Sequence, residues 1–369
     1  MTRRPNLWPV AALVAAMTAL PVLAAESSLE PKATAGLHMN DLQAVGTHNS
    51  YKIAIPPKEL ALIAARNAQG AKALDYGHLP LATQLDLGMR QLEIDFLYDP
   101  DGGRYAHPRL PQLSGEPYDA TDMDKPGFKV LHMPDADVRS HCHTFVQCLR
   151  QIRDWSDAHP DHVPLLIMMN AKDGAPSLDG GVTPLAYDAQ AFEALDAEIR
   201  SVFGPERLIT PDQVRGGHKT LREGAMAGGW PTLKAARGKV FFALDEGPAK
   251  VAVYMRGHAS LEGLPVFVNS VSEAADHAAY FTLNDPVKQF ERIQAAVKAG
   301  FVVRTRADDS TTEARRNDLS RFTKALASGA QYISTDYPTP RPEWSPYQVR
   351  LPDGVAARAN PLRGQAPRR

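Results

Sequence analysis

Short apolar or β-branched runs recur along the chain, and most are followed by a segment in which apolar residues return every three or four positions. Parallel sheets with crossover helices have this alternation. The runs predicted as strands span residues 42–50, 89–98, 129–133, 164–170, 239–245, 265–271, 301–306 and 332–336. Eight such strands predict a single-domain α/β fold, a closed (β/α)8 TIM-like barrel.

The helices predicted to cover this barrel are amphipathic segments with apolar residues on one face and charged residues on the other. They span residues 143–159, 188–203, 286–299 and 312–328. Asn284 and Asp285 come just before Pro286, which is typical of an N-cap followed by a first-turn proline. Two segments rich in Gly and Pro, 99–127 and 174–184, each follow a strand. We therefore expect them to be loops on the C-terminal rim, where barrel active sites form.

The N-terminal stretch indicates export. Arg3 and Arg4 precede an apolar run over residues 7–23, which ends at the small residues Ala24 and Ala25. This pattern predicts a cleaved signal peptide over residues 1–25 and a secreted or periplasmic protein. The alternative is a retained membrane anchor, for which the run is short and is interrupted by prolines. Residues 26–340 are expected to form the barrel, and residues 341–369, rich in Pro and Arg, an extended or disordered tail.

Charge and cysteine content narrow the possible partners and redox state. The chain has 41 Lys and Arg against 42 Asp and Glu, scattered without a basic stripe, so we expect no nucleic-acid binding. We also expect a monomer. The two cysteines, Cys142 and Cys148, can close a short disulfide loop in an oxidising compartment. Two free thiols on one helix, or a metal pair, are the alternatives, although the spacing is not that of a zinc C-x-x-C motif.

Polar and reactive residues gather where predicted strands end. His48 and Asn49 end the first strand, and Glu93 and Asp95 lie two positions apart in the second. Residues so spaced on a strand face the same side, so both carboxylates would enter one cavity and repel each other unless a cation lies between them. Together with the amide oxygen of Asn49, they favour a hard cation such as calcium or magnesium.

Further candidates lie at the ends of later strands. His132, in 129–133, can carry and release a proton near neutral pH. Asn170 ends the run 164–170 and can add an amide oxygen to the metal site, while Lys172 can balance phosphate charge. Arg304 and Arg306 alternate on one strand, and either contact a substrate anion or form buried pairs with Asp308 or Asp336.

The residues Thr47-His48-Asn49-Ser50, the Glu93-Ile94-Asp95 pair, His132 and the closing Ser334-Thr335-Asp336-Tyr337-Pro338 occur in the order that characterises one family. Over residues 41–338 the chain resembles the phosphatidylinositol-specific phospholipases C, and most closely their calcium-dependent bacterial branch.

This resemblance implies a role for each of these residues. His48 would steady the phosphoryl group, Asn49, Glu93 and Asp95 would bind Ca²⁺, and His132 would be the general acid. Eukaryotic members carry a glutamate at the end of the fourth strand, where this chain has Asn170, so the fourth ligand and the base are left open.

The implied reaction converts phosphatidylinositol into diacylglycerol and a cyclic inositol phosphate. It calls for transient contact with a membrane surface, for which Tyr76, Tyr105 and Tyr118 are candidates by position. One alternative is a glycerophosphodiester phosphodiesterase. The motif of that family resembles His-Arg-Gly at the position where this chain has His48-Asn49-Ser50. A second alternative is a non-catalytic barrel that binds a phospholipid headgroup or a glycan.

Overall fold

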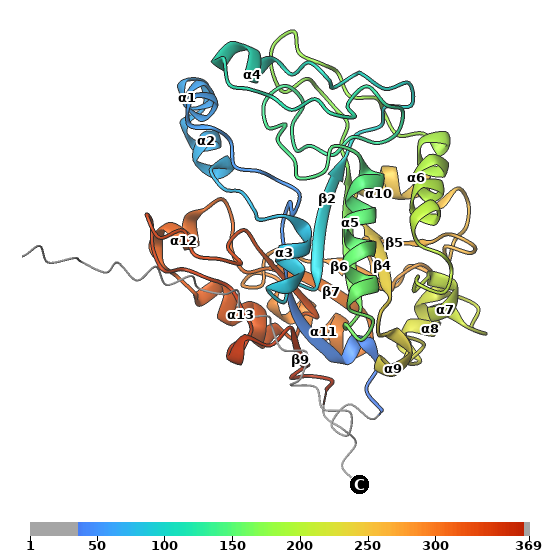
Figure 1. Ribbon diagram of the computed structural model, residues 1–369. Helices are drawn as coiled ribbons and strands as arrows, with labels where there is room; N and C mark the ends of the chain where they lie inside the picture. The colour runs from blue at the N-terminus through green and yellow to red at the C-terminus, as the bar shows by residue number, and fades with distance from the viewer. Residues whose placement is uncertain (1–35, 365–369) are drawn as a thin grey trace, which may run out of the picture.

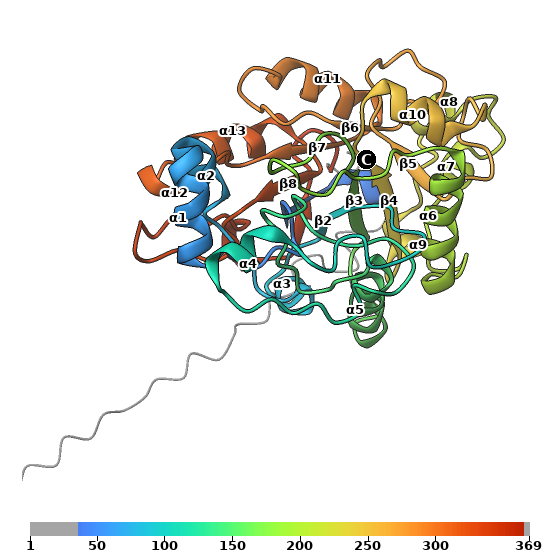
Figure 2. The same ribbon diagram turned by 90° about the horizontal axis from the view of Figure 1, so that it is seen from above.

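The structure, a computed structural model, describes residues 36–364, so the predicted signal peptide lies outside the described residues. Within that range no helix is long and apolar enough to cross a membrane. The strands and helices form a barrel with helices around it, as Figures 1 and 2 show from two directions.

Eight parallel strands form the barrel. They follow the order β5-β4-β3-β2-β1-β8-β7-β6, and a parallel bridge between Asn269 and Tyr280 links the two ends of this order. The predicted TIM-like barrel is therefore confirmed. The strands are β1 (Leu42–Thr47), β2 (Gln91–Phe96), β3 (Leu165–Ala171), β4 (Val240–Leu244), β5 (Val266–Val268), β6 (Tyr280–Thr282), β7 (Val302–Arg306) and β8 (Tyr332–Thr335).

The first two strands come unusually close at Gly46, which is paired with Gln91. A Cβ atom at Gly46 would lie 2.4 Å from both the Cβ and the carbonyl oxygen of Gln91. Only glycine therefore fits this position, two residues before His48, and the contact fixes where β1 ends relative to β2.

The prediction of a strand at 129–133 was wrong. This segment makes only isolated bridges, in which Lys129 pairs with Leu97 and Thr144, and Met133 pairs with Asp137. Its apolar residues reflect burial within the β2–β3 connection, where Val130 and Leu131 are buried. The remaining barrel strand is β6, whose three residues are too few to show a strand pattern.

The covering helices follow the predicted segments with two differences. The helix expected at 286–299 begins at Phe290, because Asp285 caps a preceding turn by accepting bonds from the backbone N–H groups of Val287 (3.1 Å) and Lys288 (3.0 Å). The helix expected at 312–328 is divided at Asn317, which has φ 53°. The outer helices include α3 (Leu81–Asp86), α5 (Phe145–Ala158), α6 (Ala189–Val202), α10 (Pro248–Met255), α11 (Phe290–Ala299), α12 (Thr312–Arg316) and α13 (Ser320–Ser328).

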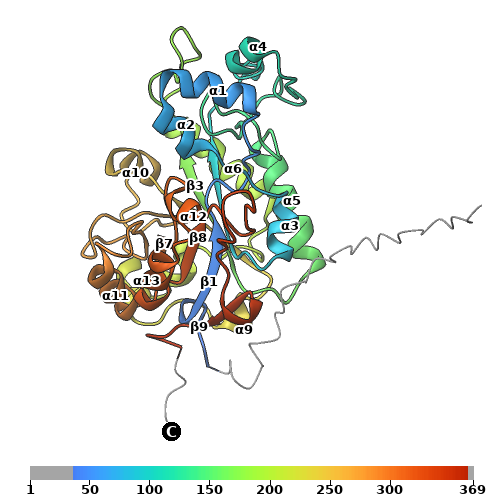
Figure 3. The same ribbon diagram turned by 90° about the vertical axis from the view of Figure 1, so that its left-hand side faces the viewer.

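Three helices lie beyond the C-terminal ends of the strands, as Figures 1 and 3 show. They are α1 (Pro57–Arg66) and α2 (Ala68–Leu74) in the β1–β2 connection and α4 (Arg109–Ser114) in the β2–β3 connection. Short helices α7 (Pro211–Arg215), α8 (Leu221–Met226) and α9 (Leu233–Ala236) fill the β3–β4 connection.

The described part of the C-terminal segment is packed, in contrast to the extended or disordered tail that composition predicted. Tyr347, Val349 and Leu351 are buried against the barrel. Further on, β9 (Ala357–Ala359) pairs antiparallel with β1, and Arg358 donates to Gln43 Oε1 at 2.6 Å. Strand β9 therefore pairs with the first half of β1, at the end of the barrel opposite the rim.

Cys142 and Cys148 form a disulfide with an S–S distance of 1.99 Å, which confirms the predicted pair. It ties the loop before α5 to the first turn of that helix. The neighbouring His141 donates from Nε2 to the carbonyl oxygen of His78 at 2.7 Å.

Candidate active site

His48, directly after β1, is held by a carboxylate from the neighbouring strand. Its Nδ1 lies 2.8 Å from Asp336 Oδ1, just after β8, and its side chain is 19% exposed. Burial, and then the charges of Arg306 and Arg304, hold the pKa of His48 well below its usual value. A neutral His48 therefore carries its proton on Nδ1, toward Asp336, and presents Nε2 to the barrel mouth.

His132 has a matching partner although it lies in a loop. Its Nδ1 lies 2.9 Å from Asp137 Oδ2, and Asp137 Oδ1 is 2.8 Å from Lys52 Nζ. Burial opposes ionisation of Asp137, but Lys52 and His132 outweigh it and lower the pKa of this carboxyl. Lys52 Nζ also lies 5.1 Å from the centre of the Tyr76 ring, and that ring stacks with the ring of His48 at a centroid distance of 6.0 Å, so the two His–Asp pairs lie near each other.

Glu93 and Asp95 are both buried on β2, and each contacts a protein cation. Glu93 Oε2 accepts from Arg304 at 2.6 Å, whereas Asp95 Oδ2 contacts Lys172 Nζ at 3.0 Å. Burial raises the pKa of Glu93 to about 7, although Arg304 opposes the shift. The repulsion between the carboxylates is therefore relieved in part by side chains of the chain itself.

The two candidate arginines have different partners. Arg306 contacts Asp336 Oδ2 at 3.3 Å, which matches the buried-pair alternative. Arg304 is almost fully buried and contacts Glu93 and Asn284 in place of the expected Asp308 or Asp336. Lys172, expected to balance phosphate, is paired with Asp95 and is one-third exposed.

The amide side chains are oriented by their NH₂ groups. Asn49, in a left-handed conformation with φ 47°, donates to the hydroxyl of Tyr76 at 2.8 Å. Asn170 donates to the carbonyl oxygen of Asp245 at 2.7 Å. In each case the amide oxygen is left as the group that can coordinate a cation.

The donor set fits a hard cation by its chemistry. Within residues 36–364, Asp95 Oδ1 is buried without a hydrogen-bond partner, and Glu93 Oε1 has a contact of 3.7 Å with His48 Nε2. No group of three or more His, Cys, Asp or Glu side chains in the described chain could hold a metal. A cation here would therefore depend on the amide oxygens of Asn49 and Asn170 as well as the two carboxylates.

Sequence reasoning missed several residues of the site. Asp137 and Lys52 lie in loops, where no strand pattern marks them, although Asp336 stands at a predicted strand end. Tyr76, assigned to membrane contact, is buried next to Asn49, and Tyr105 is buried too, so neither can contact a membrane. His78 also contributes, since its Nε2 donates to the carbonyl oxygen of His48 at 2.7 Å.

A family model matches most of the chain. The family model described as "Phosphoinositide phospholipase C, Ca2+-dependent" matches residues 37–361. No curated protein sequence matches the chain significantly.

Solved structures show the same fold. A calcium-dependent phosphoinositol-specific phospholipase C from Pseudomonas sp., in a myoinositol complex, is 17% identical with a TM-score of 0.57, over 89% of this chain and 97% of that one. A Ca²⁺-dependent phosphatidylinositol-specific phospholipase C from Streptomyces antibioticus is 19% identical with a TM-score of 0.53, over 87% of this chain and 100% of that one.

Proposed function

Because this chain belongs to the Ca²⁺-dependent phosphoinositide phospholipase C family, we propose that it cleaves phosphatidylinositol to diacylglycerol and a cyclic inositol phosphate. One observation carries the proposal. Two imidazoles, His48 and His132, are each fixed through Nδ1 by a buried carboxylate, and His48 Nε2 lies 3.7 Å from Glu93 Oε1.

The two histidines would move the protons of this reaction. His48 Nε2 accepts the proton of the inositol 2-hydroxyl, whose oxygen then attacks phosphorus, so His48 supplies the base that the sequence left open. His132 donates a proton to the glycerol oxygen as its bond to phosphorus breaks. Asp336 and Asp137 are positioning residues, since Asp336 holds the neutral ring of His48 in one tautomer and Asp137 orients and stabilises the protonated ring of His132.

We assign Ca²⁺ binding to Asn49, Glu93, Asp95 and Asn170. When bound, the cation would raise the acidity of the 2-hydroxyl and offset charge that develops on the phosphoryl oxygens. The Arg306 side chain is 13% exposed. Burial opposes its positive charge, but the carboxylates of Asp336 and Asp308 outweigh this effect and raise its pKa, so Arg306 remains a cation at the site. Lys172 is a second cation that would contact the phosphate, whereas Arg304 is 1% exposed and would act through Glu93, with which it is paired.

The proposal extends to where the enzyme meets its substrate. Export, predicted from residues 1–25, would place the enzyme in the periplasm or outside the cell. The enzyme would bind its phosphodiester substrate during transient contact with a membrane surface. It would act as a monomer.

Phosphorus NMR of the purified protein with phosphatidylinositol tests the activity, first with calcium and then with excess chelator. We expect a cyclic phosphate signal that requires calcium. His132→Ala and His48→Ala should each lower the rate by about 10²–10⁴-fold. The control is His218→Ala, since His218 is an exposed residue in the connection between α7 and α8.

Other outcomes identify the alternatives. Turnover of glycerophosphodiesters alone, without cyclic inositol phosphate, would indicate a glycerophosphodiester phosphodiesterase. Calcium binding without turnover of either substrate would indicate a non-catalytic barrel that binds headgroups.

A further inference from the structure

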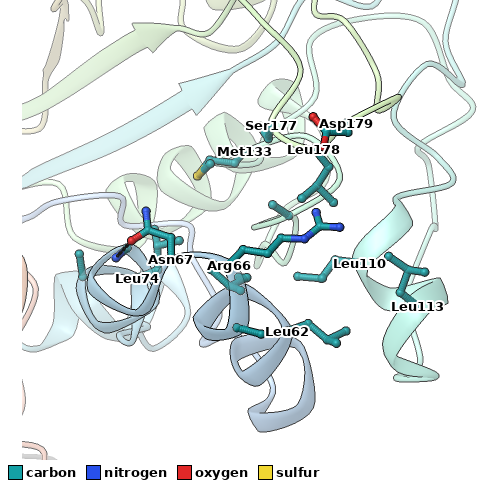
Figure 4. Close-up of a pocket in the computed structure, with 15 residues that line it drawn as sticks. Leu62, Arg66, Asn67, Leu74, Leu110, Leu113, Met133, Ser177, Leu178 and Asp179 are labelled. Carbon is teal, nitrogen blue, oxygen red and sulfur yellow. Dashed lines mark hydrogen bonds between the residues drawn. The ribbon is translucent and has the colours of Figure 1, made fainter.

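An apolar groove of about 630 Å³ lies on the rim, among α1, α2, α4, the loop at 177–179 and the loop after His132. Figure 4 shows its walls, with Leu62 and Leu110 on one side and Met133 and Leu178 on another. Arg66 and Asp179 are its charged lining residues. A concave, mostly apolar cavity of this size with few polar groups is typical of a small-molecule site.

Specific contacts hold the walls of this groove together. Asp135 accepts from the backbone N–H of Arg109 at 3.0 Å, where α4 begins, and from that of Val182 at 2.6 Å, in the second rim loop. Helix α1 is joined to the segment after α4 by an ion pair between Lys58 and Glu116, 3.1 Å apart. The groove is therefore built by the fold and is more than a gap between independent loops.

The groove continues from the proposed catalytic loop. Met133 and Ala136 line it, and they lie between His132 and Asp137, whose side chains are bonded to each other. Met133 N–H also donates to the carbonyl oxygen of Asp137 at 3.0 Å. If His132 protonates the glycerol oxygen, the diacylglycerol portion of the substrate leaves on this side of the site.

We propose that this groove binds one acyl chain of the diacylglycerol portion of the substrate. The inference rests on the proposed function, because that function places the leaving group beside His132. The apolar lining matches an alkyl chain, since the removal of apolar surface from water is favourable. Leu62 and Leu113 are 39% and 62% exposed at the mouth, where a chain would enter.

The test uses Leu62→Asp/Leu113→Asp, which places charge in the groove at exposed positions that folding tolerates. Val287→Asp is the matched control, because Val287 is 55% exposed in the turn before α11 and does not line the groove. The first readout is binding of dioctanoylglycerol, which requires no turnover. The second is kcat/KM for monomeric dihexanoyl-phosphatidylinositol, for phosphatidylinositol vesicles and for glycerophosphoinositol, which has no acyl chain.

We expect the double variant to bind dioctanoylglycerol at least tenfold more weakly and to lose about tenfold in kcat/KM for the dihexanoyl substrate. Its kcat/KM for glycerophosphoinositol should equal that of the wild type, and Val287→Asp should change neither readout. Unchanged binding of dioctanoylglycerol would overturn the inference. So would a loss confined to phosphatidylinositol vesicles, because the leucines would then form a surface for membrane insertion. Groove-dependent binding without hydrolysis of either substrate would support the groove and contradict the proposed activity.

Discussion

At the scale of single residues, the carboxylate of Asp137 contacts two functionally different side chains. Its Oδ2 fixes the ring of His132, and its Oδ1 neutralises Lys52, a lysine with no exposed side-chain surface. A substitution at Asp137 would therefore disturb proton transfer and also leave a buried cation without a partner. The two effects can be separated because they act through different oxygens.

Asp137→Asn should lower kcat by about 10²–10⁴-fold, because the uncharged amide no longer stabilises the protonated His132 that donates the proton. It should also lower the free energy of unfolding by about 3–5 kcal/mol, since Lys52 stays buried without a counter-charge. Lys52→Met/Asp137→Asn should regain most of the stability and none of the activity. Urea unfolding and steady-state kinetics on both variants check this. Recovery of activity in the double variant would show that Asp137 has only a structural role.

The same residue scale separates what sequence can predict from what it cannot. His48, Glu93 and Asp95 were predictable because reactive side chains at strand ends stand out against apolar runs. Their partners were not, because Arg304 reaches Glu93 from across the barrel, a separation of 211 residues. Strand periodicity states which face a residue occupies, but it does not state which distant charge will meet it there.

At the scale of elements, Glu198 on α6 supports the segment that leads to His132. Its Oε1 accepts from the backbone N–H of Phe128 at 3.1 Å, while Oε2 is buried with no partner among the described residues. Burial raises the pKa of this carboxyl from 4.5 to about 7, although the bond from Phe128 and the charge of Lys129 oppose the shift. The folded state therefore holds this proton more tightly than the unfolded chain.

Because the pKa of Glu198 is higher in the folded state, its contribution to stability falls as pH rises from about 4.5 to about 7. Glu198→Gln keeps an acceptor for Phe128 and removes the charge. It should leave stability unchanged at pH 4 and raise it by about 1–3 kcal/mol at pH 8. The control is Glu193→Gln, exposed on the same helix. Urea unfolding at pH 4 and pH 8 measures the free energy of unfolding of each variant. An equal effect of Glu198→Gln at the two pH values would contradict the raised pKa of Glu198.

Elements were predictable where their patterns are long. Residues 143–159 and 188–203 gave α5 and α6 to within two residues at each end, because their apolar stripes are continuous. Strand β6 has three residues and no pattern to read. The segment 129–133 has the composition of a strand but forms only isolated bridges. Whether such a segment has a neighbouring strand to pair with depends on the tertiary structure, which composition does not contain.

At the scale of the whole molecule, the C-terminal segment belongs to the same packed body as the active site. Asp308 Oδ1 accepts from the backbone N–H of Asp336 at 2.9 Å, and so fixes the carboxylate that holds His48. Its Oδ2 accepts from the hydroxyl of Tyr347 at 3.2 Å. Burial, then repulsion from Asp336, raises the pKa of Asp308 to about 7, so this carboxyl depends on donors such as Tyr347.

Two tyrosines in one cluster test whether this segment supports the barrel. Tyr347 bonds Asp308, whereas the Tyr337 hydroxyl is buried with no hydrogen-bond partner within residues 36–364. Tyr347→Phe should lower the free energy of unfolding by about 1–2 kcal/mol, because Asp308 loses a buried donor. Tyr337→Phe should be neutral or slightly stabilising, since it removes a hydroxyl that gained nothing from burial. Thermal or urea unfolding of the two variants measures the difference. Equal effects would show that the bond from Tyr347 adds nothing to packing and that the segment covers the barrel without supporting the site.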